Sequence, residues 1–153
     1  MTIRCTSTQT YTLSAVNDAN CTGTVSGSAI VTVNPNLIAG TIGSAQTICN
    51  NTAPNTLTNI VSPSGGTGTY TYQWQSSSNN ITWSNIAGAT TSSYSPGNLT
   101  SDTYFRRQVS SGSCNTVNSA SVLITINSIP TATISGNNTI CAGSSTNLNL
   151  VFT

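Results

Sequence analysis

The chain has 153 residues, of which only five carry a formal charge, and its net charge at neutral pH is +1. So little charge gives no electrostatic basis for binding nucleic acid or an anionic membrane surface, and neither partner is expected. Hydrophobic residues make up 36% of the chain, which with almost no charge does not match the composition of a disordered chain. The abundance of Val, Ile, Thr and Tyr predicts an all-β fold.

The first part of the chain is predicted to be the end of a sequence repeat. The segment 10–34 matches the segment 103–127 at a constant offset of 93 residues, which aligns Cys21 with Cys114. A repeat of this length matches a seven-stranded β-sandwich better than a solenoid unit.

A second match lies at nearly the same spacing. The segment 40–57 resembles the segment 131–150 and aligns Cys49 with Cys141 at an offset of 92 residues. Two independent matches at one period indicate a tandem array.

The repeats divide the chain into three parts. Residues 1–34 are predicted to be the C-terminal part of one repeat, residues 35–127 a complete repeat, and residues 128–153 the N-terminal part of the next. The central strands are missing from both end parts, so neither is expected to close a core, alone or head-to-tail. We therefore expect the sequence to be a fragment of a longer array.

Short β-prone runs bounded by Gly, Pro, Asn or Ser predict strands in the complete repeat. The predicted strands are 39–42, 56–61, 70–75, 81–83, 92–94, 103–110 and 120–126. Alternation in the third of these places Tyr70, Tyr72 and Trp74 on one face, with Trp74 pointing inward. No stretch has a sustained period of 3.6 residues, so essentially no helix is expected.

The complete repeat resembles a known family through the motif YQWQ (72–75), the long segment 83–114, the early segment 40–57 and the closing ITIN (124–127). These resemble the immunoglobulin-like repeats of large secreted surface proteins of gliding Bacteroidota. The resemblance implies an immunoglobulin-like β-sandwich, export by the type IX system and an extracellular location on the cell surface. It also implies a role in gliding adhesins or as an appendage of secreted hydrolases.

Two core residues follow from this resemblance. Trp74 resembles the core tryptophan of the third immunoglobulin strand, and Asp102 to Tyr104 resemble the corner where a tyrosine hydroxyl bonds to the backbone. Tyr11 is the copy of Tyr104 in the first part of the chain, where Gln9 replaces the aspartate.

The complete repeat has one early cysteine, Cys49, and one late cysteine, Cys114; Cys21 is the late cysteine of the first part and Cys141 the early cysteine of the last, and Cys5 has no counterpart in the complete repeat. The favoured pairing is within a unit, Cys49 with Cys114, and Cys5 is a candidate partner of Cys21. The alternative pairs Cys21 with Cys49 and Cys114 with Cys141 across the junctions, and a third interpretation is buried free thiols. Either disulfide scheme requires an oxidising compartment.

Catalytic chemistry is not expected. The chain has no His, Lys or Glu to activate its many hydroxyl groups, and Asp18 and Asp102 lie at different repeat positions, so no carboxylate pair is predicted. No cysteine–histidine or clustered-carboxylate metal site occurs, and no cofactor is predicted.

Three aromatic residues are candidates for ligand contact. Trp83, Tyr94 and Tyr70 could form a platform for stacking on sugars, although we favour packing in the core or against a neighbouring strand for each of them. Arg106 and Arg107 are neighbours on a strand and therefore point to opposite faces, with one of them expected in solvent.

The sequence therefore predicts a structural or adhesive repeat of an extracellular cell-surface protein, acting as a disulfide-braced stalk. Its expected partners are the neighbouring repeats and, for an adhesive role, a surface polysaccharide or glycan. The alternative is an accessory carbohydrate-binding module of a secreted hydrolase. Short junctions that contain proline are expected to restrict bending between units.

Overall fold

The computed structural model describes residues 6–135, 139–145 and 149–152. Throughout these residues the regular structure is β-strand, and no helix occurs in them. The all-β prediction is confirmed. In chain order the strands are β1 (Gln9–Thr12), β2 (Val16–Asn17), β3 (Thr22–Gly23), β4 (Ser28–Val31), β5 (Thr41–Ile42), β6 (Gln46–Cys49), β7 (Asn59–Val61), β8 (Thr71–Ser77), β9 (Ser84–Asn85), β10 (Thr103–Ser110), β11 (Val117–Asn118), β12 (Val122–Asn127), β13 (Ala132–Ser135) and β14 (Asn149–Phe152).

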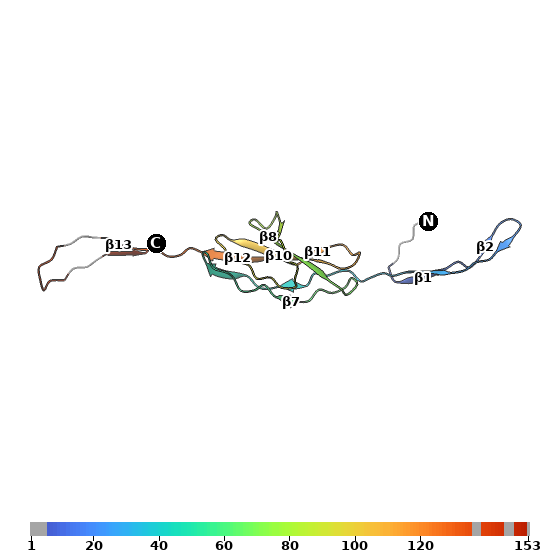
Figure 1. The fold of residues 1–153 in the computed structure, drawn as a ribbon, viewed down its shortest axis with the longest axis horizontal. Helices are drawn as coiled ribbons and strands as arrows, with labels where there is room; N and C mark the ends of the chain where they lie inside the picture. Colours follow the sequence, from blue (N-terminus) through green and yellow to red (C-terminus); the bar gives the residue numbers. More distant parts are fainter. Residues whose placement is uncertain (1–5, 136–138, 146–148, 153) are drawn as a thin grey trace.

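The central part of the chain forms two layers of strands (Figure 1). One layer is a six-stranded sheet in the order β6-β12-β10-β8-β9, with β11 paired to β10. The other contains the antiparallel pair β5-β7 and an isolated bridge between Leu57 and Tyr94. Within the six-stranded sheet β12 pairs in parallel with β6, and the other pairings are antiparallel. This arrangement is consistent with a β-sandwich.

Alternation along β10 selects the inward face of the larger sheet. Phe105, Arg107 and Val109 are buried, whereas the residues between them are only half-buried, because successive strand side chains point to opposite faces. The buried cluster between the layers contains Ile42, Leu57, Trp74, Ala89, Phe105, Val122 and Ile124.

Trp74 lies at the centre of this cluster, as the sequence predicts. Its side chain is fully buried, and its indole Nε1 donates a hydrogen bond of 2.9 Å to the carbonyl of Thr91. The ring of Tyr94 packs on it with a centroid separation of 5.6 Å. An apolar body and a satisfied N–H are what a buried tryptophan requires.

Two predicted strands, 81–83 and 92–94, are not strands in the structure, and the second contributes only the isolated bridge of Tyr94 to Leu57. The segment 81–83 is not a strand, because Asn79 Oδ1 accepts hydrogen bonds from the backbone N–H groups of Ile81 and Thr82 and holds the chain in a turn. The strand follows it as β9. Strand β6 lies outside the predicted set, because its sequence, QTIC, offers one half-buried isoleucine and little apolar alternation.

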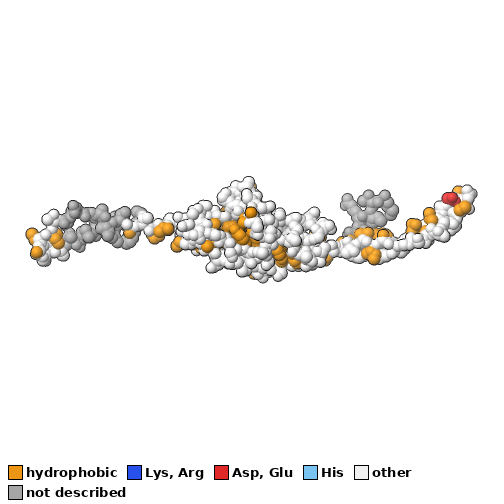
Figure 2. All heavy atoms as spheres, viewed as in Figure 1, with side chains coloured by type: hydrophobic (Ala, Val, Ile, Leu, Met, Phe, Trp, Pro, Cys, Tyr) orange, Lys and Arg blue, Asp and Glu red, His pale blue; other side chains and the backbone are white. Residues whose placement is uncertain are grey.

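Separate hairpins lie beyond the two ends of the sandwich (Figure 1). The N-terminal hairpin consists of β1 paired with β4 and β2 paired with β3. Leu13 and Ile30 are 61% and 67% exposed, and Figure 2 shows hydrophobic side chains along this thin segment. The described N-terminal hairpin therefore encloses no core. Cys5 lies outside the described residues.

Replacing Trp74 by alanine should lower the free energy of unfolding by about 3–5 kcal/mol, because a large fully buried side chain leaves a cavity. Urea denaturation of the whole chain, monitored by far-ultraviolet circular dichroism, measures the change in the free energy of unfolding. Ile81→Ala is the control, since Ile81 is 80% exposed and should change stability by less than about 0.5 kcal/mol. Equal effects of the two substitutions would contradict the assignment of the core.

Candidate functional site

A buried arginine joins the two layers of the sandwich. The side chain of Arg107 is fully buried, and its Nη1 donates a 2.7 Å hydrogen bond to the carbonyl of Ser92. Its Nη2 donates to the carbonyl of Ala39 at 3.1 Å and to Oδ1 of Asn59 at 2.9 Å. One side chain of the larger sheet thus binds three separate segments of the opposite layer.

Aromatic rings complete the surroundings of Arg107. The guanidinium carbon lies 4.8 Å from the ring centroid of Tyr72 and 6.0 Å from that of Trp74. Burial lowers the pKa of the guanidinium, and the charge interaction with Tyr72 opposes that shift. The group stays charged at neutral pH, because the ordinary pKa of arginine lies far above 7. Arg107 is a structural cation rather than a reactive group.

The opposite face of the larger sheet carries a polar and aromatic group, called here the outer-face patch: Trp83, Arg106, Gln75 and Asn85. The guanidinium carbon of Arg106 lies 4.2 Å from the ring centroid of Trp83. Arg106 Nε donates to Gln75 Oε1 at 2.7 Å, and Gln75 Nε2 donates to Asn85 Oδ1 at 2.7 Å. The arginine therefore covers one face of the indole, and the hydrogen bonds hold it there.

The structure separates the three aromatic residues considered as a sugar-stacking platform. Tyr94 lies inside the sandwich, with its ring 5.6 Å from that of Trp74 and 5.8 Å from that of Phe105. Tyr70 donates its hydroxyl to the carbonyl of Gly65 in a loop. Only Trp83 belongs to the outer face, so these residues form no common platform. Tyr94 is a packing residue, in keeping with the interpretation that we favoured.

The prediction of Tyr104 as a core residue is not supported. Phe105, Arg107 and Val109 occupy the inward positions of β10. Tyr104 therefore lies half-buried on the other face of the sheet. Its hydroxyl makes no hydrogen bond to a described residue, so the expected tyrosine corner is not formed. Asp102 of the same motif has a clear role, because its Oδ1 accepts a 2.8 Å hydrogen bond from the backbone N–H of Ile126.

The predicted pair Cys49–Cys114 is corrected by the strand register. Both are free thiols. Cys49 pairs with Asn127, beyond the Thr103 end of β10, whereas Cys114 follows Ser110 at the opposite end. The length of β10 alone separates them by roughly 24 Å at about 3.4 Å per residue. A disulfide joins Cα atoms less than about 7 Å apart, so the two cannot pair within this sandwich.

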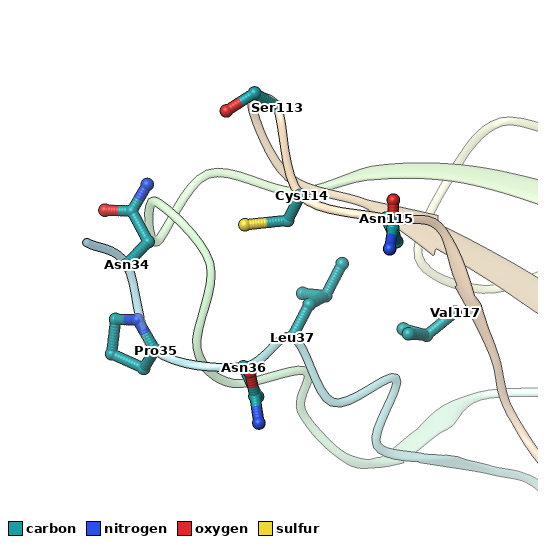
Figure 3. A pocket seen from close by; sticks show the side chains of 8 residues that line it. All are labelled: Asn34, Pro35, Asn36, Leu37, Ser113, Cys114, Asn115 and Val117. Atoms are coloured by element: carbon teal, nitrogen blue, oxygen red, sulfur yellow. The ribbon is translucent and has the colours of Figure 1, made fainter. Parts of the chain in front are cut away.

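Hollows occur at both ends of the sandwich. The N-terminal hollow has a volume of about 540 Å³ and lies between residues 34–37 and the turn that holds Cys114 (Figure 3). The C-terminal hollow has a volume of about 440 Å³ and is lined by Asn50, Asp102 and Ile129, among others. Asn50 Oδ1 is buried there without a hydrogen-bond donor from any described residue.

The linker at the N-terminal hollow is fixed to the sandwich. The backbone N–H of Gly66 donates a 2.8 Å hydrogen bond to the carbonyl of Pro35, and Ile38 bridges to Ser64. Gly65 has a φ of +76°, and a Cβ atom there would overlap the carbonyl of Asn36. Glycine at this position lets the loop lie against the linker.

Among the described residues no group of three His, Cys, Asp or Glu side chains lies close enough to hold a metal ion. The search for a long apolar helix that could span a bilayer, made over the same described part of the chain, finds none. Neither observation identifies a reaction or a cofactor.

Residues 38–128 match the family model described as domain of unknown function DUF8696, which covers more than half of the chain. The chain belongs to the DUF8696 family. No curated protein and no solved structure matches it. The DUF8696 match includes all the residues of the core cluster and of the outer-face patch.

Sequence reasoning missed the role of Arg107 in the DUF8696 domain. Alternation predicted opposite faces for Arg106 and Arg107, which the structure shows, but did not identify the inward one. The signal was the position of Arg107 midway between Phe105 and Val109, two apolar residues that share its face. A charge at such a position is buried only when acceptors surround it, and those acceptors come from distant segments.

Arg107→Lys should lower the free energy of unfolding by about 2 kcal/mol or more. A single ammonium group cannot reproduce the spread of donors to three acceptors, and an unpaired buried acceptor costs about 1–3 kcal/mol. Arg106→Lys is the matched control on the neighbouring residue and should cost less than about 1 kcal/mol. Chemical denaturation of both variants measures the difference, and similar losses would count against the buried network.

Proposed function

We propose that this DUF8696 chain is part of a structural or adhesive segment of a large extracellular protein. In this proposal tandem immunoglobulin-like β-sandwich repeats of about 93 residues form a stalk that holds another part of the protein away from the cell surface. The neighbouring repeats are its main partners, and the segment itself is not catalytic.

The observation that carries the proposal is the position of the two junctions. The chain reaches the sandwich through Pro35, which is bonded to the loop beside the Cys114 turn. It leaves after Asn127, whose carbonyl accepts a 2.9 Å hydrogen bond from Asn50 at the other end of the larger sheet. Figure 1 shows the two hairpins beyond these opposite ends. Units joined in this way extend end to end instead of folding back.

The N-terminal hairpin supports the repeat interpretation through its buried and exposed positions. At the offset of 93 residues Val16 corresponds to Val109 and Val31 to Ile124. The two residues in the hairpin are 48% and 40% exposed, whereas their counterparts in the sandwich are fully buried. The hairpin thus leaves exposed two apolar residues whose counterparts in the sandwich are buried in the core.

The second hairpin supports it through a shared turn. Thr52 donates its backbone N–H to the carbonyl of Cys49 at 3.2 Å, and Ser144 donates to the carbonyl of Cys141 at 3.0 Å. The two pairs are related by the same offset of 92 residues. In addition, the DUF8696 match over 38–128 coincides within three residues with the predicted complete unit.

The extracellular, Bacteroidota-like assignment is part of the proposal and depends on the resemblance of the sequence motifs. The two-layer arrangement around a buried Trp74 is compatible with an immunoglobulin-like sandwich. The weakly charged surface, with five charged residues in 153, leaves solubility to hydroxyl and amide groups.

The alternative function, an accessory carbohydrate-binding module, depends on Trp83. A ring that stacks on a sugar needs an open face, and Arg106 covers one face of this indole at 4.2 Å. This contact favours the structural role over the carbohydrate-binding role.

Small-angle X-ray scattering tests the end-to-end arrangement. A protein lengthened by one further copy of residues 35–127 should have a maximum dimension more than about 24 Å greater than that of the present chain, since β10 alone spans this length. The control is the same pair of proteins in urea, where the difference should no longer match a rigid unit. A tandem protein no longer than the present chain would contradict the stalk.

Binding screens separate the two functions. We expect neither Trp83→Phe nor Trp83→Ala to change the binding of the chain to polysaccharides or cell surfaces, because Arg106 covers one face of the ring. Glycan arrays and sedimentation with whole cells measure this. Saturable binding that Trp83→Ala abolishes and Trp83→Phe retains would favour the carbohydrate-binding module instead.

A further inference from the structure

Cys49 lies where the chain leaves the sandwich. It is the last residue of β6, and its partner in the parallel register with β12 is Asn127. The next residue, Asn50, donates its backbone N–H to the carbonyl of Asn127. The thiol is free and the residue is exposed, so this cysteine is accessible to whatever follows the sandwich.

Cys114 lies at the opposite end, where the chain reaches the sandwich. It lines the N-terminal hollow together with Asn34 and Pro35. Figure 3 shows its sulfur pointing from the turn toward the side of the hollow that these two residues form. The hydrogen bond from Gly66 to Pro35 fixes the linker there, so Asn34 keeps its place beside the thiol.

The repeat relates these two ends. Asn34 corresponds to Asn127 at the offset of 93 residues. If the preceding repeat has the pairing seen here between Cys49 and Asn127, its own early cysteine lies opposite Asn34. Partners in neighbouring strands are about 4.8 Å apart. The early cysteine of one repeat is therefore brought to the hollow that contains the late cysteine of the next.

We infer that each junction is a disulfide site, in which the early cysteine of one repeat bonds to the late cysteine of the repeat that follows. The inference rests on the proposed tandem architecture. A disulfide requires Cα atoms about 4.4–6.8 Å apart; the early cysteine lies one strand spacing from Asn34, and Cys114 lines the same hollow as Asn34. The hollow of about 540 Å³ provides the space for the second side chain.

The positions of the remaining cysteines agree with this pairing of an early cysteine with the late cysteine of the next repeat. They do not agree with the alternative scheme, in which Cys21 pairs with Cys49 and Cys114 with Cys141. Cys21 lies in the turn between β2 and β3, at the end of the hairpin far from the sandwich. Cys141 lies in the connection between β13 and β14, beyond the other end. The whole sandwich thus separates Cys21 from Cys49 and Cys114 from Cys141, so neither pair of the late-to-early scheme can form.

The bond forms by thiol–disulfide exchange with a small-molecule disulfide such as oxidised glutathione. One protein thiolate attacks it, giving a mixed disulfide and one reduced glutathione; the second protein thiolate then displaces the other glutathione. Two protein thiols are oxidised to one S–S bond, and one glutathione disulfide is reduced to two thiols. An oxidising compartment maintains the bond.

The test is a protein with two copies of residues 35–127 in series. Each copy is expected to fold, because the core cluster and the side chains packed on it lie between Ile42 and Ile126. Asn127 followed by Pro35 also reproduces the natural Asn34–Pro35 junction. After oxidation with glutathione, non-reducing peptide mapping should find one protein disulfide, between Cys49 of the first copy and Cys114 of the second.

Matched variants locate the bond. Cys49→Ser in the first copy should abolish the disulfide completely, whereas the same substitution in the second copy should leave its yield unchanged. A bond within one copy, a bond from Cys114 of the first copy to Cys49 of the second, or four unpaired cysteines would overturn the inference. In the present chain, a mapped Cys49–Cys114 bond within one molecule would overturn it as well.

X-ray scattering of the same tandem protein distinguishes a failure of the proposed tandem architecture from a failure of the disulfide inference alone. If its maximum dimension does not grow by one sandwich over that of a single copy, the tandem architecture fails and the inference fails with it. If the dimension grows but the disulfide joins other cysteines, only the inference fails.

Discussion

The sandwich depends on a buried positive charge that no carboxylate neutralises. The chain has two carboxylate side chains, Asp18 and Asp102, and neither bonds to Arg107. The two terminal nitrogens of the guanidinium donate instead to neutral oxygens of Ala39, Asn59 and Ser92, and aromatic faces pack on it, whereas its buried Nε has no partner among the described residues. Because these oxygens belong to the opposite layer, the arginine sets which segments meet across the core. A core with few large apolar residues gains a specific cross-link between its layers in this way, although a buried cation demands that every acceptor be in place.

The local sequence pattern predicted the features that depend only on neighbouring residues in the chain. Alternation placed Trp74 inward, and the run 103–110 was predicted with the bounds that β10 has, because it is a β-prone run with turn-forming residues on both sides. The same reasoning failed where the outcome depends on distant partners. Strand β6 exists through its parallel pairing with β12, and the separation of Cys49 from Cys114 follows from strand order, which spacing along the chain does not report.

Strand register differs between the sandwich and the N-terminal hairpin, which has no second layer among the described residues. In the sandwich Tyr104 pairs with Leu123, yet in the N-terminal hairpin its counterpart Tyr11 pairs with Ala29 and not with Ile30, the counterpart of Leu123. The two pairings differ by one residue. Such a slip moves an entire set of side chains to the other face, and it is prevented only where one face is buried. The similarity of the segments 10–34 and 103–127 therefore does not by itself determine the pairing.

The parallel pairing of β6 with β12 has a mechanical consequence. In the sequence, strand β6 comes soon after the N-terminal junction, whereas β12 ends at the C-terminal junction. Four residue pairs join the two strands. Tension applied between the two junctions pulls these neighbouring strands in opposite directions along their length. All the hydrogen bonds of the pair are then loaded together in shear, and none can be opened singly as in a zipper. Stretching the chain between the two ends of the sandwich therefore has to overcome the shear resistance of the β6–β12 pair.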